Sequence, residues 1–388
     1  MTGFWRPTTA TVDLTAISAN VVAFARLVDP AMVCAVVKAD GYGHGAVPCA
    51  QAALAAGAAW LGVATVEEAV ELREAEIDAP ILVLSEFPDS GVRAIVDHAI
   101  TPTVYSASKI KLLESAVPEG AVVRVHIKVD TGMHRVGVQP DEAGDLARLV
   151  ARSPRLELGG VFTHFAVADD PGNPYTQQQL RRFEGVLTQL AGAGITPGIV
   201  HASNSAGALA HPDARFDMVR VGVSLYGHDP DAVMRAEDFG VTLRPAMQLR
   251  SAVSHVKILE SGDRVSYGLR YTFGRTSVVA TVPIGYADGL QRRYSSVGGE
   301  VLIGGRRRPI AGRITMDQIV IDCGPPDPLA PVNPGDEVVL IGNQGEESIS
   351  AWEMAGKLDT IAYEVTCGIS KRVPRLYPGG ASSIGATS

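Results

Sequence analysis

The chain has 388 residues, more than a single hydrophobic core usually supports, so two domains are expected. Hydrophobic residues make up 46% and charged residues 20% of it, which is typical of a folded globular protein and not of a disordered chain. The net charge of −8 argues against nucleic acid or an anionic membrane as a partner, because both favour a basic surface.

Cysteine usage and the first residues indicate a soluble protein of the cytoplasm. No C-x-x-C pair occurs, so a disulfide framework or a zinc site is not expected, and we predict no metal. Residues 1–10 lack the apolar core of a signal peptide. No apolar stretch reaches the length that spans a membrane, since charged residues or glycine interrupt each candidate.

The first two-thirds of the chain alternates short apolar runs with amphipathic stretches. Helices are predicted over residues 14–28, 66–77, 107–116 and 175–190. Strands are predicted over residues 32–37, 60–65, 81–84, 101–105, 122–129, 158–163, 198–202 and 218–225. Alternating strands and helices imply parallel pairing, and eight such units favour a closed (β/α)8 barrel of the TIM type.

Beyond about residue 244 the pattern changes to short apolar runs separated by Gly, Pro, Asp and Asn. This pattern is typical of a mostly β-strand domain with tight turns. Strands are predicted over residues 278–282, 300–303, 319–321 and 337–341, with one helix over 350–358. Arg306-Arg307-Arg308 follows two glycines and is interpreted as a solvated, charged turn. The predicted domains are residues 1–242 and 243–388.

The glycines of Gly41-x-Gly43-x-x-Ala46 allow an alternative interpretation. They are compatible with the dinucleotide-binding fingerprint of a doubly wound sheet. The preceding strand leads into Lys38, however, and a charged lysine is not expected at such a phosphate turn. The barrel is therefore favoured.

Polar residues follow the predicted barrel strands at their C-terminal ends, where barrel enzymes place their active sites. Lys38, with Tyr42 and His44, follows the first of these strands. Lys38 is either a lysine whose ammonium reaches the rim or a Schiff-base nucleophile with a pKa lowered by desolvation. The glycines after it permit close approach of a ligand to the backbone.

Polar and aliphatic residues alternate along the strand at 122–129. Arg124, His126, Lys128 and Asp130 therefore share one face, and Arg135 follows shortly after. Because apolar helices cover the outside of a barrel, we expect this face to point inward or toward the mouth. Burial of so many ionisable groups is costly unless they are paired or functional.

Later strands also end in polar residues. His164 alone would be compatible with an ordinary core histidine, but Asn204 and Arg220 are at neighbouring strand ends and favour a functional role. A phosphate, which barrel enzymes often bind after their last two strands, would find hydroxyl and backbone N–H donors in Asn204-Ser205 and Gly222-Val223.

Residues 35–45 (Ala-Val-Val-Lys-Ala-Asp-Gly-Tyr-Gly-His-Gly) resemble the cofactor-attachment motif of alanine racemase, a fold-type III family with a barrel and a β domain. Residues 265–268, 283–289, 316–318, 361–365 and 372–375 resemble further motifs of that family, so the similarity runs nearly end to end. It implies a pyridoxal 5′-phosphate (PLP) enzyme that interconverts L-alanine and D-alanine as a homodimer and supplies D-alanine for peptidoglycan.

The resemblance implies two catalytic residues, Lys38 and Tyr267. Lys38 would hold the cofactor and act as one acid and base, and Tyr267 would act on the opposite face from the other subunit. Arg220 would face the pyridine nitrogen and, because arginine does not readily lose a proton, leave it unprotonated and disfavour transamination. His164 and Arg220 would stabilise the tyrosine's phenolate. The other implied cofactor-binding residues are Tyr42, His164, Asn204, Ser205, Gly222, Val223 and Tyr363.

The resemblance also implies a substrate site and a channel. Arg135 and Met316 would bind the substrate carboxylate. Lys128 matches a lysine that is carbamylated in many family members, and its carbamate would hold Arg135. Asp317 and Tyr286 would support the site. The channel's inner constriction would consist of Val167, Tyr267, Tyr286 and Tyr363, and its outer layer of Asp169, Arg292 and Arg313. Such a narrow neck favours alanine.

Four positions depart from the family pattern: Thr315 replaces a cysteine, and Asp359, Ala362 and His228 are unusual. Changes near Tyr363 leave a broader racemase, for example one for serine, as an alternative. A decarboxylase of this fold is disfavoured because it would have an acidic residue in place of Arg220. A non-catalytic PLP carrier of the single-barrel kind would lack the β domain.

Overall fold

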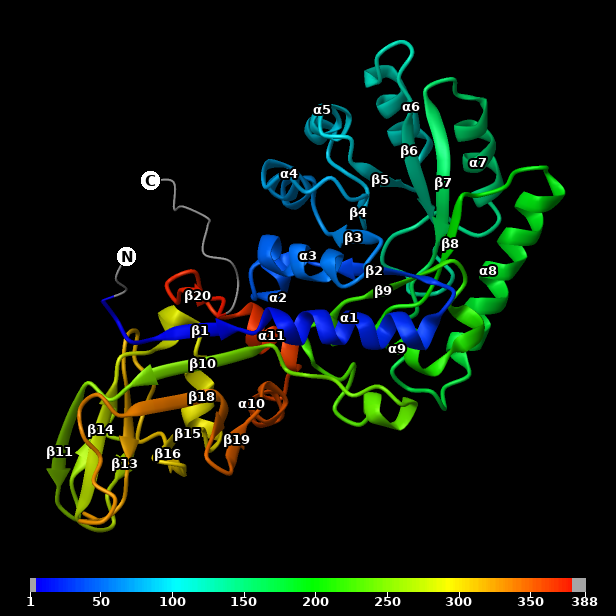
Figure 1. Cartoon of the computed structure of the whole chain (residues 1–388). Coiled ribbons are helices and arrows are strands. Elements are labelled where there is room, and N and C mark those ends of the chain that lie inside the picture. The colour runs from blue at the N-terminus through cyan, green and yellow to red at the C-terminus, as the bar shows by residue number, and fades with distance from the viewer. Residues whose placement is uncertain (1–4, 379–388) are drawn as a thin grey trace. The chain divides into compact units, whose positions relative to one another are not determined.

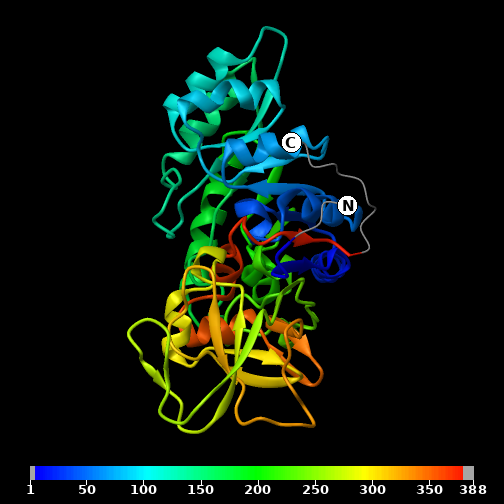
Figure 2. The same ribbon diagram turned by 90° about the vertical axis from the view of Figure 1, so that its left-hand side faces the viewer.

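The computed structural model describes residues 5–378, which form two units (Figures 1 and 2). The barrel unit is Thr15–Pro245. The β unit consists of the described residues up to Leu14 together with those from Ala246 onward. The predicted boundary at 242/243 lies three residues before the one in the structure, and it did not separate the opening segment from the barrel.

Eight parallel strands form the barrel, in the order β8-β7-β6-β5-β4-β3-β2-β9. They are β2 (Met32–Val36), β3 (Trp60–Val63), β4 (Ile81–Val83), β5 (Thr101–Val104), β6 (Val123–Lys128), β7 (Leu156–Phe162), β8 (Ile199–His201) and β9 (Met218–Val221). The ring is closed between β8 and β9, where Asp217 N–H donates to Val200 O and Arg220 N–H donates to Ser203 O, both at 3.0 Å. The predicted barrel is confirmed.

Helices lie outside these strands, as Figure 1 shows for α4 to α8. The helices of this layer are α1 (Leu14–Val28), α3 (Ala46–Ala55), α4 (Val66–Glu74), α5 (Val92–Asp97), α6 (Ala107–Ala116), α7 (Ala143–Arg152), α8 (Tyr175–Gly192) and α9 (Ser205–Ala210). Each turns an apolar face inward; α8 buries Leu180, Phe183, Val186 and Leu190 at helical spacing.

The β unit is mostly strands, as predicted. Its main sheet has the order β16-β15-β18-β10-β1-β20, with β19 paired to β18; a second sheet is β11-β14-β17, and β12 pairs with β13. The strands are β1 (Thr9–Val12), β10 (Met247–Ala252), β11 (His255–Leu259), β12 (Arg264–Val265), β13 (Tyr271–Thr272), β14 (Ser277–Val282), β15 (Glu300–Ile303), β16 (Arg306–Pro309), β17 (Ile319–Asp322), β18 (Glu337–Gln344), β19 (Glu347–Ile349) and β20 (Arg375–Leu376). Its helices are α10 (Ala351–Leu358) and α11 (Ala362–Cys367).

The opening strand β1 was not predicted, and it explains why the N-terminal segment belongs to the β unit. β1 pairs antiparallel with β10 and parallel with β20, so it lies inside the sheet. Ala10 and Val12 are fully buried on one face. Four residues are too few for an alternating pattern to stand out beside the helix that follows.

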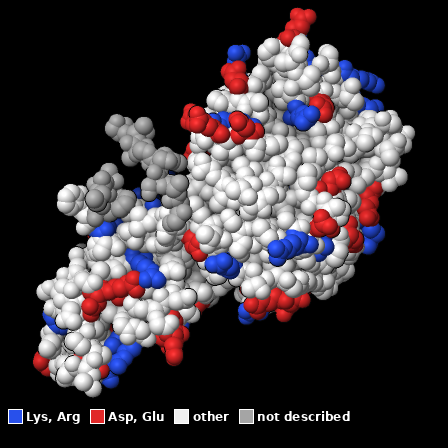
Figure 3. All heavy atoms as spheres, viewed as in Figure 1, with Lys and Arg blue, Asp and Glu red and all other residues white. Residues whose placement is uncertain are grey.

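No helix within residues 5–378 combines the length and apolar character needed to cross a membrane. On the face that Figure 3 shows, basic side chains lie interspersed with acidic ones. Exposed ion pairs such as Arg93–Asp97 and Arg148–Asp145 are of this kind, and pairs like these contribute little to stability.

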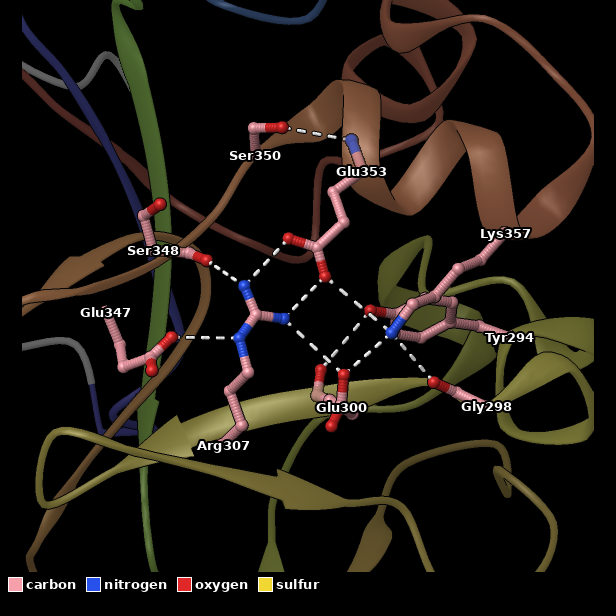
Figure 4. Close-up of polar contacts among 9 residues, drawn as sticks. All are labelled: Tyr294, Gly298, Glu300, Arg307, Glu347, Ser348, Ser350, Glu353 and Lys357. Carbon is pink, nitrogen blue, oxygen red and sulfur yellow. Dashed lines mark hydrogen bonds and ion pairs between the residues drawn. The ribbon is translucent and has the colours of Figure 1, made fainter.

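The interpretation of Arg306-Arg307-Arg308 as a charged, solvated hairpin is confirmed for the hairpin, which β15 and β16 form, and for the exposed Arg306, but it was wrong for Arg307. The glycines form the turn, but the arginines lie in β16, and Arg307 is two-thirds buried within a network that joins β15, β16, β19 and α10 (Figure 4). Its guanidinium binds Glu353 through two bonds of 2.6 and 2.9 Å and Glu347 at 2.9 Å. Glu300 connects it to Lys357, whose Nζ lies 2.8 Å from that carboxylate. The burial of Arg307 depends on contacts with distant segments, and a run of three residues in the sequence does not predict such contacts.

We predict that Arg307→Met lowers the free energy of unfolding by about 1–3 kcal/mol, between the values for exposed and buried pairs, because it leaves three carboxylates without their shared cation. Arg306→Met, which removes an exposed pair with Asp327, serves as the matched control and should cost less than about 1 kcal/mol. Urea unfolding measures both.

The same comparison has a pH dependence. The hydrogen bonds from Arg307 hold the pKa of Glu353 below its ordinary value. That stabilisation is therefore present above the unfolded-state pKa and is lost as the pH falls through the lower, folded-state value. The difference between wild type and Arg307→Met should shrink in acid, and a difference that grows in acid would contradict this account of the network.

Candidate active site

Lys38 lies where β2 gives way to an unusual left-handed turn, α2 (Lys38–Tyr42). Ala39, Asp40, Gly41 and Tyr42 have φ values of 52°, 52°, 60° and 54°. A left-handed conformation costs about 1–2 kcal/mol for each residue with a Cβ atom, so the three that are not glycine are strained. Strain of this kind persists where surrounding contacts enforce it, and it clusters at functional sites.

Tyr42, Ser205 and Gly222 converge beside Lys38. The Lys38 ammonium lies 6.0 Å from the centre of the Tyr42 ring. A Cβ atom at Gly222 would lie only 2.6 Å from the Tyr42 hydroxyl, so that hydroxyl requires a glycine there. Gly222 N–H donates to Ser205 Oγ at 3.0 Å. Val223 follows at the start of a short 3-10 turn (Val223–Tyr226), at the point where the predicted strand 218–225 actually ends.

Arg220, in β9, is a buried cation held by neutral acceptors. Its guanidinium donates to Thr163 O at 2.9 Å, to Ala202 O at 2.8 Å and to His201 Nδ1 at 2.9 Å. It also lies 3.2 Å from His164 Nδ1. Within residues 5–378, no carboxylate pairs with it. Burial lowers its pKa to about 10, which still leaves it fully charged at neutral pH.

The histidines beside Arg220 are held neutral, and their tautomers follow from the donors. Because arginine only donates, His201 Nδ1 accepts, and its Nε2–H then donates to His126 Nδ1 at 2.9 Å. Burial, followed by the charge of Arg220, lowers the pKa of His126 to about 3 and that of His201 well below its ordinary value. His164 is likewise neutral, for the same causes.

Lys128 lies at the end of β6 among other cations. Burial, and then the charges of Arg220, Arg135 and Lys38, lower its pKa to about 7. Its ammonium lies 5.5 Å from the centre of the Phe162 ring. The charges of three other cations therefore act on Lys128, which favours an anion beside it. Arg135 itself is exposed on the loop after β6.

One residue of the expected polar face does not belong to this group. Arg124 lies at the other end of β6, is exposed and pairs with Glu157 at 3.1 Å, so the expectation that it points inward or to the mouth was wrong. Its position near the first residues of a barrel strand places it at the face opposite the catalytic one. Asn204 also has a local task, because its Oδ1 caps α9 by accepting from Gly207 N–H at 2.9 Å.

The remaining predicted residues lie in the β unit. Tyr267 is at the tip of the β12–β13 hairpin, in a turn where Ser266 and Leu269 have positive φ. The residue is 71% exposed, so the described part of the β unit covers little of its ring. Ser266 Oγ anchors the turn by donating to Arg313 O at 2.7 Å.

Tyr286 and Met316 are brought together by Gly285, where a Cβ atom would lie 2.3 Å from the backbone oxygens of residues 315 and 316. Tyr286 N–H donates to Thr315 O at 3.0 Å. Both side chains are exposed. Tyr363 lies elsewhere in the unit, near the start of α11, and is partly buried.

A buried carboxylate, Asp288, fixes this part of the β unit. It accepts from Gly285 N–H at 2.9 Å and pairs with Arg6 at 2.7 Å. Arg372 lies 3.5 Å from Asp288 and also pairs with Asp317 at 2.8 Å. Asp317 is thus linked through Arg372 to the segment that carries Tyr286.

Two residues of the barrel site, His201 and Glu68, were not predicted from the sequence. His201 holds Arg220, and Glu68 binds the backbone next to Lys38. Within the sequence, Thr65-x-x-Glu68 has the spacing of a helix capping box, which would have identified a cap but not the contact with the neighbouring loop.

Comparisons with known proteins agree with this arrangement. Residues 12–230 match the family model for the alanine racemase N-terminal domain, and residues 246–377 match that for the C-terminal domain. The chain is 50% identical over 375 residues to an alanine racemase of Symbiobacterium thermophilum, covering 96% of this chain and 98% of that one. It is 42% identical to alanine racemase 1 of Bacillus subtilis, covering 96% and 94%.

Solved structures give the same result. The alanine racemase of D-cycloserine-producing Streptomyces lavendulae superposes with a TM-score of 0.90 at 38% identity, covering 97% of this chain and 98% of that one. A histidine racemase from Leuconostoc mesenteroides superposes with a TM-score of 0.88 at 26% identity, covering 97% and 99%. The chain therefore belongs to the alanine racemase family.

Proposed function

We propose that this protein is a PLP-dependent racemase that interconverts L-alanine and D-alanine as a homodimer in the cytoplasm, and so supplies D-alanine for peptidoglycan. The observation that carries the proposal is the buried Arg220, whose charge is opposed by no carboxylate of the described residues and which shares its site with Lys38. A decarboxylase of the same fold would have an acidic residue at that position.

The donor set of the barrel fits PLP. The cofactor carries a phosphate and a phenolic oxygen, and the positive charges of Arg220, Arg135 and Lys38 all act at Lys128. The Tyr42 hydroxyl, the Ser205 hydroxyl and the backbone of Gly222 and Val223 would hold the phosphate, at a place where a Cβ atom on Gly222 would obstruct the approach. Asn204 and His164 would complete the barrel's set, and Tyr363 of the β unit would be a further cofactor-binding residue.

Bound PLP would supply an electron sink for the pair of electrons left when the substrate loses its Cα proton. The chain's own residues move that proton. The amine of Lys38 takes or returns it on one face, and the phenol of Tyr267, from the partner subunit's β unit, does so on the other. Arg220 keeps its protons, so it would donate a hydrogen bond to the cofactor's pyridine nitrogen without protonating it. An unprotonated ring would favour return of the substrate's proton to Cα.

The substrate carboxylate would be bound by Arg135 and by the backbone N–H of Met316. Tyr267, Tyr286, Val167 and Tyr363 would leave room for a methyl side chain and little more. A different amino acid is the alternative, because the similar histidine racemase shows that this fold accommodates other side chains.

Surface charge supports the homodimer. In the β unit, Arg270, Arg292 and Arg313 lie close enough that the first two lower the pKa of Arg313. In the barrel unit, Asp169, Asp170, Asp231 and Asp238 line an open hollow of about 450 Å³. Opposite charges on two surfaces of one chain favour pairing of two copies, and this pairing would bring the exposed Tyr267 of one copy to the other's barrel.

The first prediction concerns the reaction. The purified protein with PLP should convert L-alanine to D-alanine and D-alanine to L-alanine. In deuterated water, the product should carry deuterium at Cα. Tyr267→Phe should reduce both directions by at least about 100-fold, because general acid–base catalysis contributes on the order of 10²–10⁴. Tyr271→Phe, a neighbouring hairpin tyrosine bonded to Asp322, serves as the control.

Faster turnover of serine or histidine than of alanine would overturn the substrate assignment. Unchanged rates in Tyr267→Phe would overturn the two-base arrangement while leaving the PLP assignment intact.

The second prediction concerns Lys128. Its pKa of about 7 makes the neutral amine abundant above that pH, and the amine can add to CO2 with release of a proton. The resulting carbamate would be stabilised by Arg135, Arg220 and Lys38. Carbon-13 bicarbonate should therefore label the protein at pH 8, and the label should be lost below pH 6. A label that survives in Lys128→Ala, or its absence at pH 8, would contradict the prediction.

The third prediction concerns assembly. Sedimentation should show a dimer, and Arg313→Glu should weaken it by about tenfold in dissociation constant, because like charges then face each other. Adding Asp169→Arg should recover part of the loss. Arg306→Glu, which is not part of the group formed by Arg270, Arg292 and Arg313, is the control. A monomeric wild type would contradict the homodimer.

A further inference from the structure

Glu68 joins two loops at the mouth of the barrel. It lies in the first turn of α4, and its Oε2 accepts from Ala64 N–H at 2.7 Å and from Thr65 N–H at 3.2 Å. Its Oε1 accepts from Ala39 N–H at 2.6 Å. One carboxylate therefore binds the loop after β3 with one oxygen and the loop after β2 with the other.

The bond to Ala39 is not needed to cap the helix. A capping box requires only that the glutamate accept from the N-cap backbone, which Oε2 of Glu68 already does. The helix α10 gives an internal comparison, because Glu353 occupies the same position after its cap Ser350 but directs its carboxylate to Arg307. The hydrogen bond between Glu68 and Ala39 is thus specific to this site and is not a general consequence of the helix cap.

Ala39 is the first residue after Lys38 and opens the left-handed turn. Its φ is 52°, and it is exposed, so packing does not hold it in this conformation. Its N–H instead meets a charged acceptor, the stronger kind of hydrogen bond. Farther along, Asp40 Oδ1 accepts from Ala46 N–H at 2.9 Å, and Gly43 N–H donates to Ala39 O at 3.0 Å. The turn is therefore fixed at both ends, by Glu68 and by the start of α3.

We infer that Glu68 is a positioning residue for Lys38: by holding Ala39 N–H, it keeps the strained turn in the one conformation that directs the lysine into the barrel mouth. This inference rests on the proposed function, since Lys38 is there the group that moves the proton. A misplacement of about 1 Å in such a group reduces rate by about 100-fold.

The test compares Glu68→Ala and Glu68→Gln with Glu67→Ala, a change of the exposed neighbour on the same helix turn. In the PLP-loaded enzyme, Glu68→Ala should lower kcat by about 10- to 100-fold with KM changed less than about threefold, because the turn and not the substrate contacts is altered. Glu68→Gln keeps only one acceptor oxygen for the two loops, so its kcat should lie between those of wild type and Glu68→Ala. Glu67→Ala should match wild type.

A second readout does not depend on activity. Amide hydrogen exchange of a peptide covering residues 38–46 should be faster in Glu68→Ala than in wild type or Glu67→Ala, with and without PLP. Adding Ala39→Gly should restore about 3- to 10-fold of kcat to Glu68→Ala, because glycine adopts a positive φ without a steric penalty.

Loss of kcat in Glu68→Ala no greater than in Glu67→Ala, or unchanged exchange in this peptide, would overturn the inference. So would a loss that Ala39→Gly leaves untouched, since that result would place the effect in α4 alone. A wild type that does not racemise alanine would refute the proposed function, and the exchange measurement would still decide the role of Glu68.

Discussion

The guanidinium of Arg220, which is buried with no carboxylate partner among residues 5–378, is the constraint on which the barrel site depends. Arg220 is held by two carbonyls and by His201, whose other nitrogen is held in turn by His126. Burying a charge without a counterion is costly, so such a group is retained where its charge is used. Neutral histidines and backbone carbonyls accept from Arg220 and leave its charge intact.

Backbone strain is the second recurring device, and it marks both units. The barrel unit has its left-handed turn after Lys38, and the β unit has the hairpin of Tyr267, where Ser266 and Leu269 also have positive φ. A hydrogen bond to a residue outside the turn holds each one: Ala39 N–H donates to Glu68 in the first, and Ser266 Oγ donates to Arg313 O in the second. The two proposed acid–base residues thus both lie on backbone that a flexible loop would not maintain.

The sequence predicts the features that depend on local pattern or on a matched motif. The eight barrel strands follow from apolar periodicity, and Lys38 and Arg220 follow from their places at strand ends together with the family resemblance. His201, Glu68 and the Arg307 network depend on contacts between segments 19 to 75 residues apart, which no local pattern encodes. Arg124 was misplaced because alternation shows which residues share a face but not which end of the barrel each occupies.

The central claim is that Arg220 keeps its protons and leaves the cofactor's ring nitrogen unprotonated. Nitrogen-15 NMR of the enzyme loaded with PLP labelled at that nitrogen measures this directly. The wild type should show the shift of an unprotonated, hydrogen-bonded nitrogen, and Arg220→Glu the shift of a protonated one. A protonated nitrogen in wild type would contradict it.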